Sequence, residues 1–242
     1  YLCGVNCPAN PGAWELHGVF HKKLKKHRKT NADSGVHQQR TREAAEEQAR
    51  DAAQSGDEYQ KLLAEGLRYH SEGDYRKAGK AFREAIALRP DEPTTYLNLG
   101  AVLANSGHYV EAAQRYLDAK ERYPVGSERW AESTAMSFET LMQEVCDEVA
   151  KPEWWNDQAL KALSARVVRA SPNHAAANKM RATMMSGRAG HLWGAGPRSA
   201  AELKEAVTHY ERAAALANAP VMKAELKHFA NVYRGLYMLR SL

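Results

Sequence analysis

Two consecutive stretches of 34 residues decide the fold. Residues 59–92 read YQKLLAEGLRYHSEGDYRKAGKAFREAIALRPDE, and residues 93–126 read PTTYLNLGAVLANSGHYVEAAQRYLDAKERYPVG. At this constant offset the two stretches share small, aromatic and proline positions. The shared pairs are Gly66 with Gly100, Gly73 with Gly107, Tyr75 with Tyr109, Ala78 with Ala112, Phe82 with Tyr116, Ala85 with Ala119, and Pro90 with Pro124. So many coincidences at one offset indicate an internal repeat.

The shared residue types have steric roles that fit a pair of packed helices. In the first stretch, Gly66 and Ala78 are small enough to let two helices approach closely, and Phe82 fills the space beside them. Gly73 separates the two helices. Pro90 ends the second one, because proline lacks a backbone N–H and clashes with the preceding turn. Each stretch is therefore predicted to form a helical hairpin.

The period of 34 residues and these positions resemble the tetratricopeptide-repeat family. The resemblance implies an all-α fold, in which helical hairpins stack into a right-handed superhelix with a capping helix at its C-terminal end. It is clear over residues 59–126 and looser over residues 127–218. The superhelical domain is expected to span residues 59–242.

The later repeats are expected to be irregular. Pro172 follows Pro124 by 48 residues, so a third unit over 127–174 must absorb a surplus. A long first helix and the loop with Pro152 are expected to absorb it. A fourth unit over 175–218 has Ala182 at the close-packing position and an insertion around 187–197. Residues 219–240 carry apolar residues at helical spacing and predict the capping helix.

The two insertions contain three tryptophans, Trp154, Trp155 and Trp193. Two interpretations stay open for them. Aromatic side chains in loops are frequent anchors for a partner protein. They also fill gaps between irregular repeats.

The N-terminal part carries most of the positive charge. The formal net charge is +5, and a basic run lies within residues 21–29: Lys22, Lys23, Lys25, Lys26, Arg28 and Lys29. The rest of the chain is therefore close to neutral. The basic run is predicted to contact an acidic partner or nucleic acid, and the alternatives are an import signal or ordinary solvated charge. Residues 30–58 are interpreted as a linker followed by a helix over 41–58.

Cysteine and histidine residues precede and overlap the basic run. Cys3, Cys7, His17 and His21, with His27 as an alternative ligand, could close a tetrahedral zinc site in the segment 1–29. The stretch resembles the second half of a MYND finger, although His21 replaces the usual cysteine. It also resembles the end of a matrin-type finger, although Cys3 and Cys7 are one residue too far apart. Free cysteines in a basic extension are the alternative.

The family resemblance places ligand contacts on the first helices of the repeats. These positions are Leu63, Leu67, His70, Leu97, Asn98 and Ala101. Only Asn98 matches the known clamp for acidic chaperone tails, and Leu63 and Leu67 replace its Lys and Asn, so that ligand is disfavoured. The apolar positions favour a partner's amphipathic helix or extended apolar peptide. The chain's own helix 41–58 is the alternative occupant.

Several classes of protein are not expected from the sequence. It contains no phosphate loop, nucleophile elbow, His-Glu-x-x-His motif or dinucleotide fingerprint, so no enzymatic activity is predicted and zinc is the only cofactor considered. No apolar stretch is long enough to predict a transmembrane helix. The few cysteines favour an intracellular location, cytoplasmic or nuclear. Because the chain begins at Tyr1, we expect residues before it, which leaves organelle targeting open.

The sequence therefore predicts a scaffold or adaptor that binds another protein through its repeats. The alternatives are a nucleic-acid-associated zinc-finger protein with accessory repeats, or a structural subunit of a large assembly.

Overall fold

A computed structural model describes residues 56–241 of the chain. These residues form nine α-helices and two short 3₁₀ turns, and no strand occurs among them. The α-helices are α3 (Glu58–Glu72), α4 (Tyr75–Leu88), α5 (Pro93–Asn105), α6 (Tyr109–Arg122), α7 (Glu128–Leu141), α8 (Asp157–Ala170), α9 (Ala175–Ser186), α10 (Ala200–Leu216) and α11 (Pro220–Arg240). The 3₁₀ turns are η1 (Glu144–Cys146) and η2 (Gly190–Leu192).

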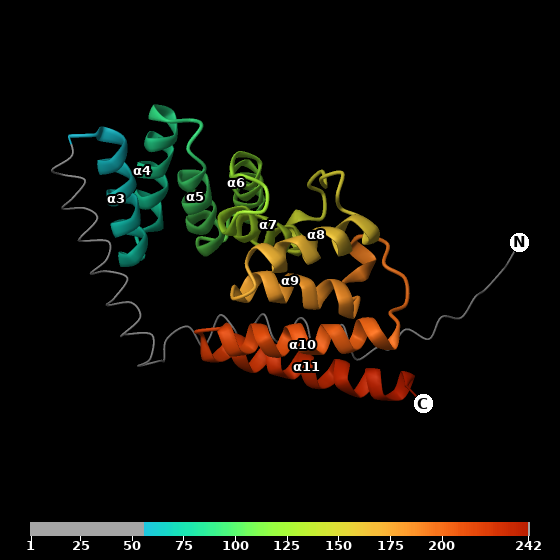
Figure 1. Cartoon of the computed structure of the whole chain (residues 1–242). Coiled ribbons are helices and arrows are strands. Elements are labelled where there is room, and N and C mark those ends of the chain that lie inside the picture. The colour runs from blue at the N-terminus through green and yellow to red at the C-terminus, as the bar shows by residue number, and fades with distance from the viewer. Residues whose placement is uncertain (1–55, 242) are drawn as a thin grey trace, which may run out of the picture. The chain divides into compact units, whose positions relative to one another are not determined.

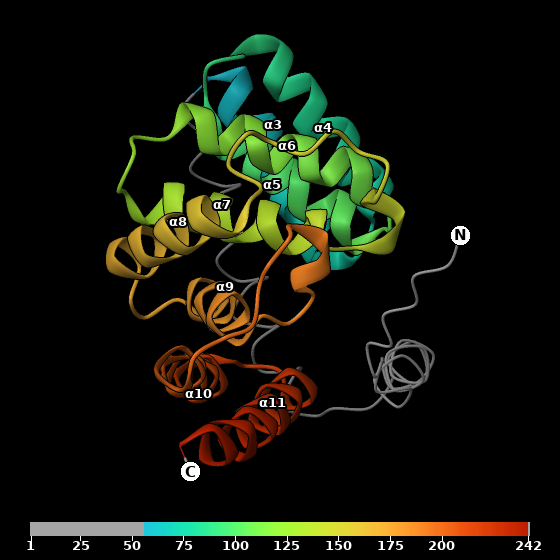
Figure 2. The same ribbon diagram turned by 90° about the vertical axis from the view of Figure 1, so that its right-hand side faces the viewer.

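The helices pack in the order of the chain. Each helix contacts the next one, so that α3/α4, α5/α6, α7/α8 and α9/α10 form four hairpins, and α11 lies along α10 (Figures 1 and 2). In addition, α3 contacts α5 and α7 contacts α9. The first helices of neighbouring hairpins therefore line the more closely spaced face of the stack. The predicted all-α fold of stacked hairpins with a C-terminal capping helix is confirmed.

The close-packing positions of the repeat lie where the two helices of a hairpin meet. Phe82 of α4 lies against Gly66 of α3, and a Cβ atom added at Gly66 would be 2.5 Å from the ring. Tyr116 of α6 lies against Gly100 of α5 in the same way, at 2.8 Å. Both aromatic side chains are buried. The glycines are thus required by the contact itself.

The turns follow the local sequence. Gly73, between α3 and α4, has a φ of 81°, which is a left-handed conformation that glycine adopts without strain. Pro90 and Pro124 each stand two residues after the end of a second helix. Asp57 and Asp74 accept hydrogen bonds from backbone N–H groups in the first turns of α3 and α4.

The third hairpin corrects one expectation. Helix α7 is the first helix of this hairpin. It has 14 residues, the same length as α4 and α6, so it is not lengthened. The surplus lies instead between α7 and α8, in a segment that includes η1. Helix α7 ends at Leu141, and the chain needs the additional residues to bring Trp155 back over Phe138 in the core.

The segment before α3 differs in part from the expected helix 41–58. Residues 41–55 lie outside the described residues. Gly56 and Asp57 are not helical, and Glu58 is the first residue of α3. The proposed division into an N-terminal segment, a linker and a repeat domain stays a prediction.

Candidate functional site

The predicted groove positions lie on the first helices of the first two hairpins. Leu63 and Leu67 of α3 are half-buried and pack against the apolar cluster that α3 to α6 share. Leu97 of α5 is only 5% exposed and belongs to that cluster, so its side chain packs in the core rather than on the exposed face. Asn98 and Ala101 are half-buried on α5. A role for these residues in binding stays a prediction.

A polar contact links the two helices of this face. The Asn105 Nδ2 atom of α5 lies 2.9 Å from the His70 Nε2 atom of α3. Burial lowers the pKa of His70 below its ordinary value of 6.5, so the ring is neutral at pH 7. A neutral ring with its hydrogen on Nδ1 accepts the amide hydrogen of Asn105 at Nε2. The Asn98 side chain, in contrast, makes no hydrogen bond with any described residue.

The first helices of the third and fourth hairpins, α7 and α9, also contact each other, and the side chains between them differ in character from those of α3 and α5. A shallow hollow between these helices is lined by Ala135, Phe138, Met142 and Met180, among others. The Lys179 Nζ atom lies 2.6 Å from the Glu139 Oε1 atom across this hollow. Burial disfavours the charged lysine, but Glu139 outweighs it and the pKa of Lys179 is raised. The hollow between α7 and α9 is therefore bridged by the ion pair of Lys179 and Glu139.

Comparisons with known proteins agree with this architecture. Residues 66–107 match a family model described as TPR repeat. Over these residues the hairpins match tetratricopeptide repeats. The chain also resembles a crystal structure of the MamA protein, with 16% sequence identity, a TM-score of 0.50, and coverage of 77% of this chain and 87% of that one. A second MamA crystal structure shows 16% identity, a TM-score of 0.43, and coverage of 73% and 94%. At this identity the likeness concerns the fold alone. No curated protein matches the chain.

The tryptophans of the inserted segments now separate into two groups. Trp155 and Trp193 are buried and lie against Phe138, with ring centroids 5.5 Å and 5.7 Å away. The Trp155 Nε1 atom donates a hydrogen bond of 2.9 Å to the Leu192 carbonyl, which joins the two insertions. These two side chains fill the irregular repeats, whereas Trp154 is half-buried at the surface.

The predicted zinc ligands and the basic run belong to the N-terminal part of the chain. Cys3, Cys7, His17, His21, His27 and the basic run Lys22–Lys29 lie outside the described residues. Within residues 56–241, no group of three His, Cys, Asp or Glu side chains could hold a metal ion. No helix among those residues is long and apolar enough to cross a membrane. Cys146 is a free, buried cysteine, and burial raises the pKa of its thiol.

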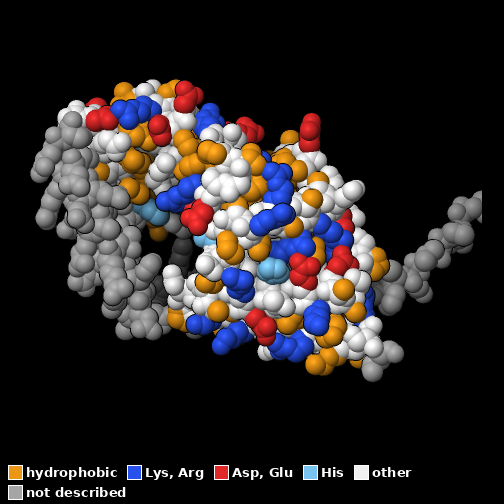
Figure 3. Space-filling model, in the orientation of Figure 1, with side chains coloured by type: hydrophobic (Ala, Val, Ile, Leu, Met, Phe, Trp, Pro, Cys, Tyr) orange, Lys and Arg blue, Asp and Glu red, His pale blue; other side chains and the backbone are white. Residues whose placement is uncertain are grey.

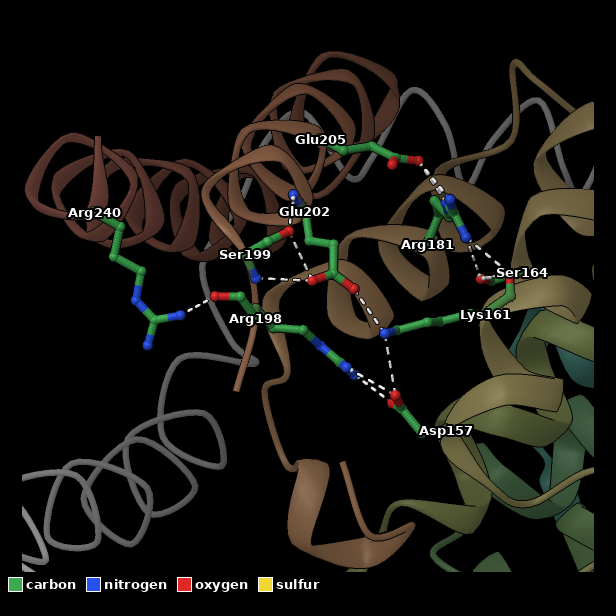
Figure 4. A network of polar contacts seen from close by, with 9 residues as sticks. All are labelled: Asp157, Lys161, Ser164, Arg181, Arg198, Ser199, Glu202, Glu205 and Arg240. Atoms are coloured by element: carbon green, nitrogen blue, oxygen red, sulfur yellow. Dashed lines mark hydrogen bonds and ion pairs between the residues drawn. The ribbon is translucent and has the colours of Figure 1, made fainter. Parts of the chain in front are cut away.

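An ion-pair network holds the last two repeats together (Figure 4). Arg198, in the insertion before α10, is 5% exposed and binds Asp157 of α8 through two hydrogen bonds of 2.9 Å and 2.5 Å. Lys161 lies 3.1 Å from Asp157 and 2.6 Å from Glu202 of α10. Arg240 of α11 donates to the Arg198 carbonyl. The network therefore ties α8, α10 and α11 to the insertion.

The charges in this network shift the acidity of its carboxyl groups. Hydrogen bonds from Arg198 lower the pKa of Asp157 to about 2. Burial works against ionisation of Glu202, but hydrogen bonds from Lys161 and Ser199 outweigh it and lower its pKa to about 2. Sequence analysis missed these residues, because Asp157 and Arg198 are 41 residues apart in segments without a repeat counterpart.

Proposed function

We propose that this chain is a scaffold or adaptor that holds a partner protein on the face formed by α3 and α5. The observation that carries the proposal is the character of this face. Leu63 and Leu67 of α3 and Ala101 of α5 are half-buried rather than enclosed. None of the predicted groove residues carries a charge at pH 7, since His70 is neutral. Covering an uncharged apolar face with a partner removes apolar surface from water, which lowers the free energy of the complex.

The expected ligand is an amphipathic helix or an extended apolar segment. Burial of apolar surface contributes about 25 cal/mol per Å². The unpartnered amide of Asn98 supports the same proposal, because it can hydrogen-bond with a ligand backbone and fix its register.

Affinity purification with matched variants tests this function. Ala101→Arg places a long charged side chain on the proposed binding face. Ala87→Arg makes the same substitution at an exposed position of α4, on a second helix of the stack. Partners that bind the wild type and the Ala87→Arg variant, but not the Ala101→Arg variant, would support the proposal. Equal recovery with both variants would overturn it.

The N-terminal segment is proposed to anchor the scaffold to a second, acidic partner. This part of the proposal is supported by the sequence of the basic run alone. Zinc is proposed to be held in this segment by Cys3, Cys7, His17 and His21. Metal analysis of the intact chain tests it: about one zinc per chain is expected, and it should be lost in Cys7→Ser. Salt-dependent binding of RNA or DNA by the intact chain would instead favour the nucleic-acid alternative.

An intracellular scaffold without catalytic activity is the function that these features favour together. Tetratricopeptide repeats suit this role because each hairpin adds binding surface without a central active site. Fluorescent tagging of the full-length protein in its own cells tests the location. Fluorescence in the cytoplasm or nucleus is expected, and secretion would contradict the proposal.

A further inference from the structure

A second surface feature lies between the second helices of two neighbouring repeats. A pocket of about 350 Å³ opens between α6 and α8. Its walls are the side chains of Lys120, Val125, Trp130, Trp154, Leu163 and Arg166, together with two alanines of α8. The segment between α7 and α8 supplies Trp154, so the irregular third repeat creates this pocket. It has no part in the α3/α5 face.

Two cations lie in this pocket against aromatic rings. The Lys120 Nζ atom is 5.6 Å from the centroid of the Trp154 ring. The Arg166 Cζ atom is 5.3 Å from the centroid of the Trp130 ring. Trp130 is buried, so its ring gives Arg166 a rigid platform. The rings hold both cations at the pocket without neutralising them.

Neither cation has a carboxylate partner among the described residues. Several other basic side chains of the later repeats are paired: Lys161 with Asp157 and Glu202, Lys179 with Glu139, Arg181 with Glu205, and Arg198 with Asp157. No acidic residue lines the pocket. Lys120 and Arg166 therefore leave a local excess of positive charge.

The pKa of Lys120 shows that burial disfavours its charged form. Burial is the main cause of the lowered pKa of Lys120; the charge of Glu121 raises this pKa, and the smaller effect of Arg166 lowers it. An anion in the pocket would offset both effects, because an opposite charge stabilises the protonated lysine. A negative group in the pocket would therefore favour the charged form of Lys120.

The geometry points to an acidic peptide segment of a partner protein as the ligand of this pocket, with a carboxylate between Lys120 and Arg166 and an apolar side chain against Trp154 and Leu163. The volume lies at the lower end of the range for ligand pockets and suits one or two side chains. The walls are apolar apart from the two cations, which favours a peptide side chain over a hydrated polyanion. Basic and acidic side chains are interspersed on the face seen in Figure 3, rather than gathered in the basic stripe that a nucleic acid needs.

Selection from a displayed peptide library against the intact chain tests this inference. The enriched peptides should combine Asp or Glu with an adjacent large apolar residue. One such peptide is then synthesised with a fluorescent label, and its affinity is measured by fluorescence anisotropy. Lys120→Gln and Arg166→Gln should each weaken binding about tenfold or more, because each removes one of the two charges that hold the carboxylate.

Matched variants separate the pocket from the rest of the surface. Arg169→Gln removes an exposed cation from the same helix outside the pocket and should change the affinity less than twofold. Val125 is 66% exposed at the rim, so Val125→Asp should repel the peptide while Val125→Lys retains it. Ala101→Arg should leave binding intact, which distinguishes this pocket from the α3/α5 face.

Some outcomes would overturn the inference. Enrichment of neutral or basic peptides, or no enrichment at all, would contradict an acidic ligand. Equal affinity of the acidic peptide for the wild type and both pocket variants would place its binding elsewhere. Circular dichroism of each variant shows whether the helices are retained, so that a loss of affinity is assigned to the pocket only in folded protein.

Discussion

Gly66 and Phe82 touch so closely that one additional carbon atom at Gly66 would lie 2.5 Å from the ring of Phe82. Gly66→Ala therefore forces a buried aromatic ring to move. Alanine is favoured over glycine in a helix by about 1 kcal/mol, but overpacking costs about 1–3 kcal/mol. The difference is a net destabilisation of up to about 2 kcal/mol, which urea unfolding measures.

Gly235 provides the matched control for this prediction. It also lies inside a helix, α11, but nothing lies within 4 Å of an added Cβ atom. Gly235→Ala should thus stabilise the chain by up to about 1 kcal/mol. If both substitutions stabilised the chain equally, the close contact between α3 and α4 would be wrong.

The Asp157–Arg198 pair predicts a second effect on stability. Asp157→Asn leaves the buried guanidinium of Arg198 without its carboxylate, and we expect a loss of about 2–4 kcal/mol at pH 7. Asp91→Asn, at an exposed turn residue, should change the stability by less than about 0.5 kcal/mol. Urea unfolding at pH 7 compares the two variants with the wild type.

The same pair predicts how this difference depends on pH. The pKa of Asp157 is about 2 in the folded chain, against about 3.9 in an unfolded chain. A lowered carboxyl pKa stabilises the fold above the unfolded value, and this contribution is lost as the pH falls from about 4 to about 2. The difference between the wild type and Asp157→Asn should therefore shrink over that interval. A constant difference down to pH 2 would show that the ion pair is not its source.

These predictions concern two kinds of contact, and only one could be predicted from the sequence. Gly66 and Phe82 recur as Gly100 and Tyr116 in the next repeat, so the spacing itself reveals their contact. Trp155 and Leu192, or Asp157 and Arg198, lie in segments that occur once. No periodicity relates them, and their pairing depends on how the insertions fold over the third and fourth repeats.

For the predicted groove, the sequence indicated which helix carries each residue but not how deeply the residue is buried. The six family positions lie on the first helices α3 and α5: Leu63, Leu67, His70, Leu97, Asn98 and Ala101. They did not distinguish Leu97, which is buried, from the more accessible positions, because burial depends on the neighbouring helices. The pocket with Lys120 and Arg166 could not be predicted from the sequence either, since its walls come from α6, α7, α8 and the segments between them.

Trp155 and Trp193 should respond differently to the same substitution. Trp155→Phe removes the hydrogen bond to the Leu192 carbonyl, whereas Trp193→Phe removes a buried N–H that has no partner among the described atoms. Both changes reduce the apolar volume by a similar amount. We therefore expect Trp155→Phe to cost about 1–2 kcal/mol more than Trp193→Phe. Thermal and urea unfolding of the two variants measure the difference, and equal losses would contradict the role of the hydrogen bond.

His70 gives a prediction about the α3/α5 face in solution. Burial lowers its pKa below 6.5, and Nε2 faces the Asn105 amide at 2.9 Å. NMR titration of the ring should find a neutral imidazole at pH 7 with its hydrogen on Nδ1. Because the folded chain binds this proton more weakly than the unfolded chain, His70 contributes stability above pH 6.5 that is lost as the pH falls. Asn105→Ala opens the ring to water and should move its pKa back toward the ordinary value. A ring that titrates at 6.5 or above in the wild type would mean that the face carries a positive charge near neutral pH, and that it is less suited to an apolar partner than we propose.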